Sequence, residues 1–290
     1  MKRFFIIGNP RSGTTLLRLM LNRHSKMCVP PEAGFLVWLY KFYGNESINV
    51  ENFLDDLSRT SKFESWNIDI EKLRTFLCRR EVKSYQFLID SVYEFYIDDV
   101  LGKNVDVVGD KNNYYLEHVE LLSSLYPEAS FLHIIRDGRS VAASYKGVMA
   151  SQLDSKYAPK LPTSMREIGS QWRCNVIEIE RQFSMLNKVS HMTLRFEDLV
   201  KNPEETLSIV SEFLGVDYEK EMLQYHKTSL NEGLEPEEYN AWKAKNLKPI
   251  DSSEAEKYKQ LSYEEIAVFE SVCSDVLLRY NYGLSGVGYD

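Results

Sequence analysis

A glycine-bracketed loop near the start of the chain has the residue types that bind a phosphate or sulfate group. It reads Gly8-Asn9-Pro10-Arg11-Ser12-Gly13-Thr14-Thr15. Such a loop can turn its backbone N–H groups toward an anion, and the N-terminus of a following helix attracts negative charge. The Walker A pattern G-x-x-x-x-G-K-[ST] fits at every fixed position except the lysine, which is replaced by Thr14. The loop is therefore built for an anion but lacks the lysine that grips the β- and γ-phosphates of ATP.

A second anion site is indicated by the stretch 131–140, whose apolar run ends in Arg136. Asp137-Gly138 forms a turn after it, and a helical pattern follows. On that helix Ser140 and Ser144 are one turn apart on the same face. An arginine and a hydroxyl near a helix start can bind a phosphate, with the guanidinium donating two hydrogen bonds. The residues alone leave open that Arg136 simply pairs with an acidic neighbour.

Glu32 and Lys111 are the candidates for proton transfer and for stabilising developing charge. Lys111 follows an apolar run at 105–109. Glu32 follows Pro30-Pro31 and a short apolar segment at 27–29, which would bring it back near the anion loop. A glutamate ahead of a helix can equally be a favourable charge at the helix N-terminus, so the residues alone leave the role of Glu32 open.

The elements that must position these residues are apolar runs rich in β-branched residues, separated by helical patterns. Strands are predicted at 2–7, 105–109, 131–135 and 191–196, with a possible short strand at 27–29. This alternation is typical of a parallel sheet covered by helices on both faces. Ligands of such sheets bind at the carboxyl ends of the strands. We therefore predict an α/β fold with a P-loop-type parallel β-sheet flanked by helices.

The whole chain, residues 1–290, is predicted to form one domain. Residues 34–103 predict a helical insertion, and residues 227–261 predict a loop. Capping-box patterns predict helices from Ser164 to about 187 and from Ser262 to about 280, and Asn202-Pro203 predicts a third that ends at Gly215.

Composition narrows the classes of function. The chain is 43% hydrophobic and 27% charged, as soluble enzymes are, and its net charge of -8 argues against a nucleic-acid-binding surface. The four cysteines lie far apart, which fits reduced thiols and a cytoplasmic location. No Cys/His cluster has metal-ligand spacing, so no metal site is predicted. No signal peptide or membrane span is predicted.

The two anion motifs in combination resemble those of sulfotransferases that use 3′-phosphoadenosine 5′-phosphosulfate (PAPS). In that family an R/K-S-G-T-T loop binds the 5′-phosphosulfate. A strand-ending arginine and a serine eight residues later, here Arg136 and Ser144, bind the 3′-phosphate. The stretch 194–199 followed by Asn202-Pro203 is also similar, and the resemblance extends from residue 3 to about 283. The pattern is most similar to bacterial sulfotransferases with a P-R-S-G-T-T-L-L loop and to tyrosylprotein sulfotransferases.

The resemblance implies roles for individual residues. In tyrosylprotein sulfotransferases the base is a glutamate about twenty residues past the loop arginine, and Glu32 lies twenty-one residues after Arg11. Lys111 is implied to contact the leaving phosphate or the sulfuryl group. Small-molecule sulfotransferases carry a histidine base where this chain has Asn113, so that mechanism is lost. The implied catalytic residues are Glu32, Lys111 and Arg11. The implied cofactor-binding residues are Arg11, Ser12, Gly13, Thr14, Thr15, Arg136, Ser144, Trp172, Phe196, Trp242 and Lys243, the last two in a loop that closes over the cofactor.

The expected reaction is sulfuryl transfer from PAPS to a hydroxyl by in-line displacement, without a metal. The acceptor is left open among carbohydrate, lipid, small molecule and peptide tyrosine, and the oligomeric state is also open. The aromatic residues that follow Glu32 either line an acceptor pocket or form a core; they are Phe35, Trp38, Tyr40, Phe42 and Tyr43. One alternative is a P-loop kinase or nucleotide hydrolase using Mg-ATP, with Asp110 as a Walker B aspartate. Another is a non-catalytic nucleotide-binding module.

Overall fold

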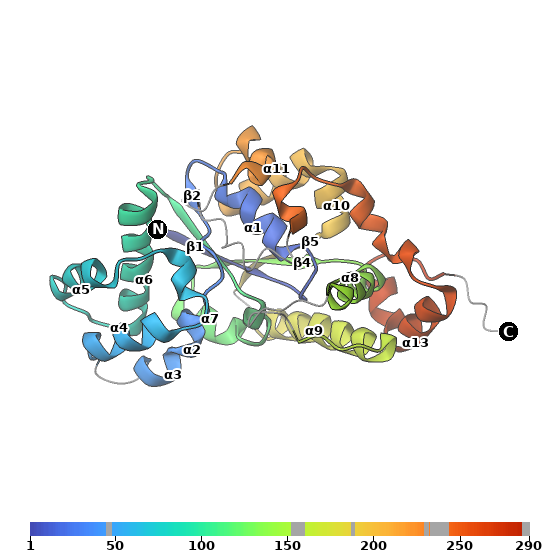
Figure 1. Cartoon of the computed structure of the whole chain (residues 1–290), viewed down its shortest axis with the longest axis horizontal. Helices are drawn as coiled ribbons and strands as arrows, with labels where there is room; N and C mark the ends of the chain where they lie inside the picture. Colours follow the sequence, from blue (N-terminus) through green and yellow to red (C-terminus); the bar gives the residue numbers. More distant parts are fainter. Residues whose placement is uncertain (45–47, 152–159, 187–188, 229–231, 233–243, 286–290) are drawn as a thin grey trace.

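Five parallel strands form the centre of the molecule, with helices on both faces (Figure 1). The computed structural model describes residues 1–44, 48–151, 160–186, 189–228, 232 and 244–285. The strands are β1 (Lys2–Ile7), β2 (Met27–Cys28), β3 (Val107–Lys111), β4 (Ser130–Ile135) and β5 (Ser190–Arg195), in the spatial order β2-β3-β1-β4-β5. This arrangement confirms the predicted α/β fold.

Strand β3 begins and ends two residues later than predicted. Its parallel pairing with β1 aligns Lys2 with Val107 and Ile6 with Lys111, so Lys111 is the last residue of the strand. The prediction of 105–109 followed the apolar residues, whereas the ladder continues through the polar residues Asp110 and Lys111. Strand β5 ends before Phe196, which begins α10 (Phe196–Lys201).

Alternate residues of the central strands enter two different cores. Phe4, Ile6 and Leu132 pack on one face against α1 (Thr14–Asn22), α10 and α11 (Pro203–Leu214). Phe5 and Phe131 pack on the opposite face against α7 (Val119–Leu125), α9 (Met165–Met185) and the helices of residues 35–101.

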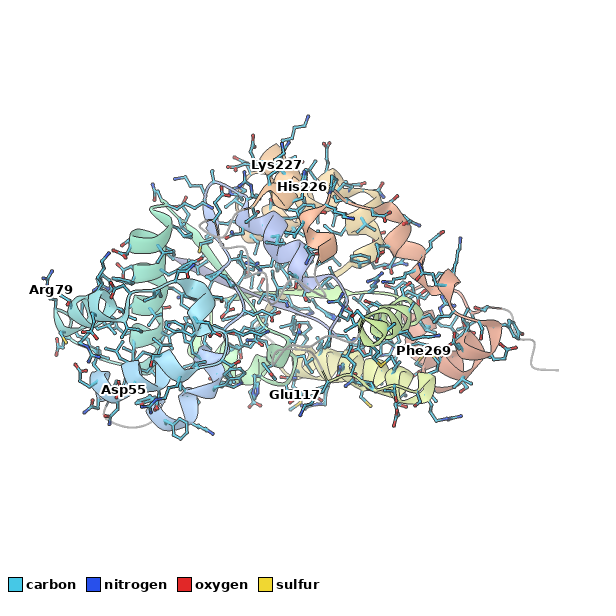
Figure 2. All side chains as sticks on the ribbon, in the orientation of Figure 1. Asp55, Arg79, Glu117, His226, Lys227 and Phe269 are labelled. Carbon is cyan, nitrogen blue, oxygen red and sulfur yellow. The ribbon has the colours of Figure 1, made fainter. Side chains whose placement is uncertain are left out.

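The helical insertion forms the left part of Figures 1 and 2, where Asp55 and Arg79 are labelled. It contains α2 (Phe35–Trp38), α3 (Tyr40–Tyr43), α4 (Val50–Arg59), α5 (Ile70–Cys78) and α6 (Tyr85–Phe95), with short turns η1 (Phe63–Trp66) and η2 (Tyr96–Leu101). Trp66 is fully buried at its centre, and its ring lies 5.1 Å from Phe35 and 5.0 Å from Tyr93 between centroids. These rings form the centre of the insertion and belong to the same hydrophobic core as Phe5 and Phe131 of the sheet.

A third core joins α8 (Gly138–Ala150), α9 and α13 (Tyr263–Arg279), with Phe269 labelled in Figure 2. Both predicted capping boxes are present, at Ser164 and Ser262. Among the residues described here, no helix combines the length and apolar character of a membrane-spanning segment.

The prediction of a plain loop at 227–261 is wrong for the part that the structure describes. Short helical turns are present at η6 (Ala244–Leu247) and η7 (Ser252–Gln260), and η4 (Lys220–Lys227) ends where the predicted loop begins. Turn η7 is fixed by local capping and by α8: Asp251 accepts from the Ser253 N–H, and Ser140 Oγ accepts from the Tyr258 N–H at 3.1 Å. The bond between Ser140 and Tyr258 joins residues 118 positions apart, so no local sequence pattern predicts it.

Candidate active site

The anion loop lies between β1 and α1 and is shaped by Gly13. This residue has φ 95°, and a Cβ here would lie 2.3 Å from the Phe196 ring, so only glycine fits. The loop is closed by a hydrogen bond from the Ser12 N–H to the Asn9 carbonyl oxygen at 3.1 Å. Ser12 Oγ is fully buried and has no hydrogen-bond partner among the described residues. A buried hydroxyl without a hydrogen-bond partner destabilises the fold unless a ligand accepts its hydrogen bond. An anion bound in the loop would accept that bond.

Two guanidinium groups, of the half-buried Arg11 and the buried Arg136, lie beside this loop. Arg136, just past the end of β4, donates from Nη1 to the Arg11 carbonyl oxygen at 3.1 Å, and Arg11 Nε donates to Ser144 Oγ at 3.2 Å. Burial and the neighbouring charge of Arg136 lower the pKa of Arg11 to about 10. Burial also lowers the pKa of Arg136. Two positive groups held close together and partly shielded from water form an electrostatic site for an anion.

Glu254 on η7 is the carboxylate that contacts this pair in the structure. Arg136 Nη2 donates to the Glu254 carbonyl oxygen at 2.6 Å and lies 3.4 Å from Glu254 Oε2. Arg136 Nε is buried without a hydrogen-bond partner among the described residues. The segment predicted to close over a cofactor therefore does reach Arg136.

Phe196 and Trp172 lie on either side of the Arg136 backbone and side chain. The Arg136 guanidinium lies over the Phe196 ring, 4.2 Å from its centroid. Trp172 instead donates from Nε1 to the Arg136 carbonyl oxygen at 3.2 Å and is buried against Phe269. Its ring belongs to the α8–α9–α13 core, so packing accounts for Trp172, while its contact with adenine stays a prediction. Trp242 and Lys243 lie outside the described residues.

Lys111 and Glu32 form a buried ion pair next to the anion loop. Lys111 Nζ contacts Glu32 Oε1 and lies 3.3 Å from Thr15 Oγ1. The side chains of Lys111 and Glu32 are only 2% and 5% exposed. The structure thus brings together the three elements that the sequence suggested: the end of β3, the loop and the segment after β2.

Lys62 also reaches Glu32, and no motif in the sequence marks it. Its Nζ lies 2.7 Å from Glu32 Oε2, so the two carboxylate oxygens each contact a lysine. Lys62 comes from the helical insertion, just before η1. Most of its neighbours in the sequence, such as Ser61 and Glu64, are polar as well, so no local pattern singles it out.

Asp110 is not placed as a magnesium ligand. It is buried on the face of the sheet opposite Lys111, and Tyr93 and Tyr115 both donate to its Oδ2. Burial raises the pKa of Asp110 to about 6. A carboxyl group bound by two tyrosines in the core does not support the kinase or nucleotide hydrolase alternative.

The raised pKa of Asp110 predicts a specific pH dependence of stability. Because the folded-state pKa of about 6 lies above the ordinary value of 3.8 for an aspartate, protonated Asp110 stabilises the fold at low pH. This contribution is lost as the pH rises from about 4 to about 6. Urea unfolding of the wild type and of Asp110→Asn should therefore show a difference in unfolding free energy that falls over this window. A difference that rises or stays flat contradicts the assignment.

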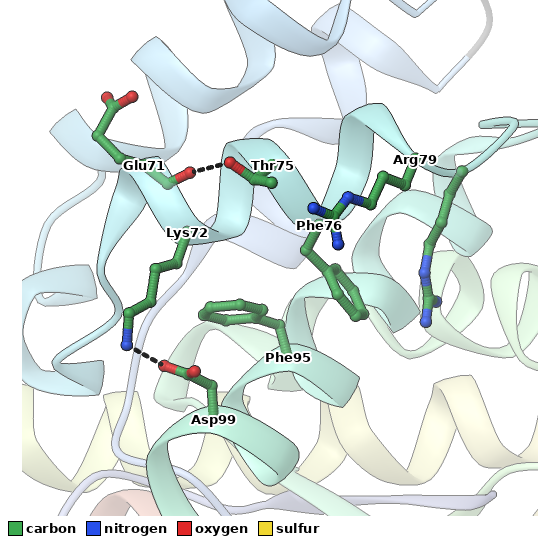
Figure 3. A pocket seen from close by; sticks show the side chains of 8 residues that line it. Glu71, Lys72, Thr75, Phe76, Arg79, Phe95 and Asp99 are labelled. Carbon is green, nitrogen blue, oxygen red and sulfur yellow. Dashed lines mark hydrogen bonds and ion pairs between the residues drawn. The ribbon is translucent and has the colours of Figure 1, made fainter.

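A surface hollow on the helical insertion contains none of these residues. It has a volume of about 690 Å³ and lies between α5 and the end of α6 with η2 (Figure 3). Its lining mixes an ion pair, Lys72 with Asp99 at 3.5 Å, and the rings of Phe76 and Phe95. The candidate chemistry lies at the sheet edge and not in this hollow.

The sequence of this chain is similar to those of known proteins. The model of the sulfotransferase family matches residues 3–220. Protein-tyrosine sulfotransferase A of Caenorhabditis elegans is 22% identical over 96% of this chain and 66% of its own length. Nodulation protein NoeE of Sinorhizobium fredii is 24% identical over 96% of this chain and 65% of its own. The chain spans just under two thirds of the length of these two relatives.

Solved structures share the fold. The sulfotransferase domain from the curacin biosynthetic pathway matches with a TM-score of 0.62 and 24% identity, over 98% of this chain and 99% of that one. Mouse sulfotransferase SULT7A1, in a complex with PAP, matches with a TM-score of 0.51 and 11% identity, over 95% of this chain and 84% of that one. Since the family model covers most of the sequence and includes the loop, Glu32, Lys111 and Arg136, the resemblance predicted from the motifs is confirmed, and the chain belongs to the sulfotransferase family.

Proposed function

We propose that this chain transfers a sulfuryl group from PAPS to a hydroxyl of an acceptor, with Glu32 as the general base and without a bound metal ion. The observation that carries the proposal is the meeting of Arg11 and Arg136 at the carboxyl edge of the sheet. PAPS carries two separate anionic groups, and two neighbouring guanidinium groups, one of them buried, match such a ligand. The likeness in fold to a sulfotransferase complexed with PAP supports this choice.

The residues present fit the cofactor. Ser12 Oγ and Arg136 Nε are buried donors whose hydrogen bonds are not completed by the described residues, and both suit phosphate oxygens. The loop residues 11–15 would hold the 5′-phosphosulfate, and Arg136 with Ser144 would hold the 3′-phosphate. A phosphate at Arg136 would compete with the carboxylate of Glu254. Phe196 lies directly beside Arg136 and offers an aromatic face to the adenine.

The chemistry then consists of positioning and charge stabilisation. PAPS supplies the sulfuryl group and a phosphate leaving group. Glu32 accepts the proton of the acceptor hydroxyl, which contributes roughly 10²–10⁴-fold for a well-placed base. Lys111 lies between Glu32 and Thr15, where its ammonium group can stabilise the charge that develops on the leaving oxygen. Arg11 supports the same charge from the loop.

The acceptor is proposed only as a hydroxyl compound. Phe35 and Tyr43 are core residues, whereas Phe42 is 53% exposed. Trp38 packs edge-on against Tyr114, 5.1 Å between ring centroids, and Tyr114 is 55% exposed. Of the predicted aromatic wall, Trp38 and Tyr40 are half-buried and Phe42 is exposed, and Tyr114 adds a ring beside Trp38 that was not predicted from the sequence. Carbohydrate, lipid, small-molecule and peptide-tyrosine hydroxyls all belong in a panel assayed with labelled PAPS, and the cytoplasmic location predicted from the cysteines stays a proposal.

Cofactor selectivity is the direct test of this function. We expect calorimetry to show that PAP binds without Mg²⁺ and more tightly than Mg-ATP, because the loop has no Walker lysine and Asp110 is bound by tyrosines. Titration of PAP in the presence of EDTA is the control for a metal requirement. Tighter binding of Mg-ATP than of PAP would overturn the proposal and favour a nucleotide hydrolase or kinase.

A further inference from the structure

Lys62 has an unusual backbone conformation. Among the described residues, four that are not glycine have a positive φ: Arg11, Lys62, Asn67 and Asn281. Asparagine tolerates this region, whereas a lysine or an arginine adopts it only at a cost in conformational energy. Such strain is typically kept at functional sites. Arg11 is already part of the anion loop, and Lys62, with φ 70°, is the other charged residue of the set.

The surroundings of Lys62 fix its ammonium group on Glu32. Immediately after it, η1 is anchored by Trp66, whose Nε1 donates to the Pro31 carbonyl oxygen at 2.9 Å. The Lys62 carbonyl oxygen accepts from Ser65 Oγ at 2.6 Å. At one end of the turn, Trp66 is therefore bonded to Pro31, the residue before Glu32. At the other end, Lys62 Nζ lies 2.7 Å from Glu32 Oε2.

We propose that Lys62 is a positioning residue for sulfuryl transfer: its ammonium group holds Glu32 Oε2 so that the carboxylate keeps its orientation between Lys111 and the acceptor hydroxyl. This inference rests on the proposed function. A carboxylate oxygen has two lone pairs, so Oε2 can keep the contact with Lys62 and still accept a proton. The helical insertion thus takes part in the reaction through one side chain, in addition to shaping the acceptor side.

The first test separates the effect of the Lys62 ammonium group from the effect of the positive φ of its backbone. Lys62→Met removes the charge and keeps the length of the side chain. Lys62→Gly also relieves the positive φ, so that variant should fold at least as well as the wild type. We expect both to lower kcat by about tenfold or more, because a small misplacement of a catalytic group is that costly, while the KM for PAPS and the affinity for PAP stay unchanged. Lys62→Arg should restore most of the rate.

The matched control is Lys72→Met. Lys72 belongs to the same helical insertion and pairs with Asp99 at 3.5 Å, but its side chain is 62% exposed and lies in the surface hollow of Figure 3. Its substitution should leave kcat unchanged. Wild-type kcat in Lys62→Met and Lys62→Gly would overturn the proposal.

A double variant shows whether Lys62 acts through Glu32. If it does, adding Lys62→Met to Glu32→Gln should cause no further loss of kcat, since the group it positions is already gone. Losses that multiply would mean that Lys62 acts independently of Glu32, which contradicts the proposal.

Lysine acetylation with N-hydroxysuccinimidyl acetate, read by mass spectrometry, tests the contact without an acceptor. Lys62 should be protected in the wild type and become several-fold more reactive in Glu32→Gln, whereas the reactivity of Lys72 should not change. Equal reactivity of Lys62 in both proteins would overturn the positioning role. Failure of the wild-type protein to bind PAP would contradict the proposed function. The acetylation experiment would still show whether Lys62 contacts Glu32, because it needs neither PAP nor an acceptor.

Discussion

The Glu32→Gln variant is expected to lose about 10²-fold or more in turnover while its affinity for PAP changes little. Glutamine has the size of glutamate and can accept hydrogen bonds from Lys111 and Lys62, but it cannot take the proton of an acceptor hydroxyl. Removing a negative charge beside two ammonium groups does not weaken an anion site. The loss should therefore appear in kcat with an unactivated hydroxyl acceptor found by the labelled-PAPS panel.

Glu94→Gln is the control for this experiment. Glu94 lies on α6 of the helical insertion and pairs with Arg80 through both carboxylate oxygens, at 2.6 and 3.1 Å. This variant carries the same glutamate-to-glutamine substitution at a carboxylate that also forms an ion pair. Among the contacts of the described residues, Glu94 has none with Glu32 or Lys111. We expect Glu94→Gln to keep normal turnover. Normal turnover in Glu32→Gln would instead reduce Glu32 to a structural partner of the two lysines.

The Arg136→Ala variant is expected to bind PAP roughly ten- to a hundred-fold more weakly. A hydrogen bond to a charged group contributes about 1.5–3 kcal/mol, which corresponds to that range of affinity. The guanidinium lies over Phe196 and against Glu254, so its removal takes away the charge proposed to bind the 3′-phosphate. Calorimetric titration with PAP measures the effect.

Adenosine 5′-phosphosulfate has no 3′-phosphate. Its affinity shows whether Arg136→Ala has lost recognition of the 3′-phosphate alone or has disturbed the fold of the whole site. Its affinity should be nearly the same in Arg136→Ala and in the wild type. Arg173→Ala provides a matched surface change, because Arg173 on α9 pairs with the exposed Asp275 at 2.8 Å, and both ligands should bind it normally. Equal weakening of both ligands by Arg136→Ala would mean that Arg136 mainly supports the anion loop through its bond to the Arg11 carbonyl oxygen.

The sequence by itself determined the features that are encoded locally. The apolar runs gave the strands of the sheet, and both capping boxes formed where Ser164 and Ser262 predicted them. The anion loop, Arg136 and Lys111 could be predicted because each follows an apolar run, and parallel strands present their carboxyl ends at one edge. In a parallel sheet, residues at the carboxyl ends of neighbouring strands lie close together. The members of the candidate site could therefore be predicted from the sequence without knowledge of their contacts.

The tertiary structure decided which side chains meet, since those contacts join distant segments. The ladder with β1 placed Lys111 inside β3, against the local apolar pattern. Trp172 and Phe35 are buried in two different hydrophobic cores. Lys62 reaches Glu32 across 30 residues, through a strained turn anchored by Trp66. Glu254 reaches Arg136 across 118 residues. The energy of such contacts depends on the packing of whole elements, and no short stretch of sequence contains that information.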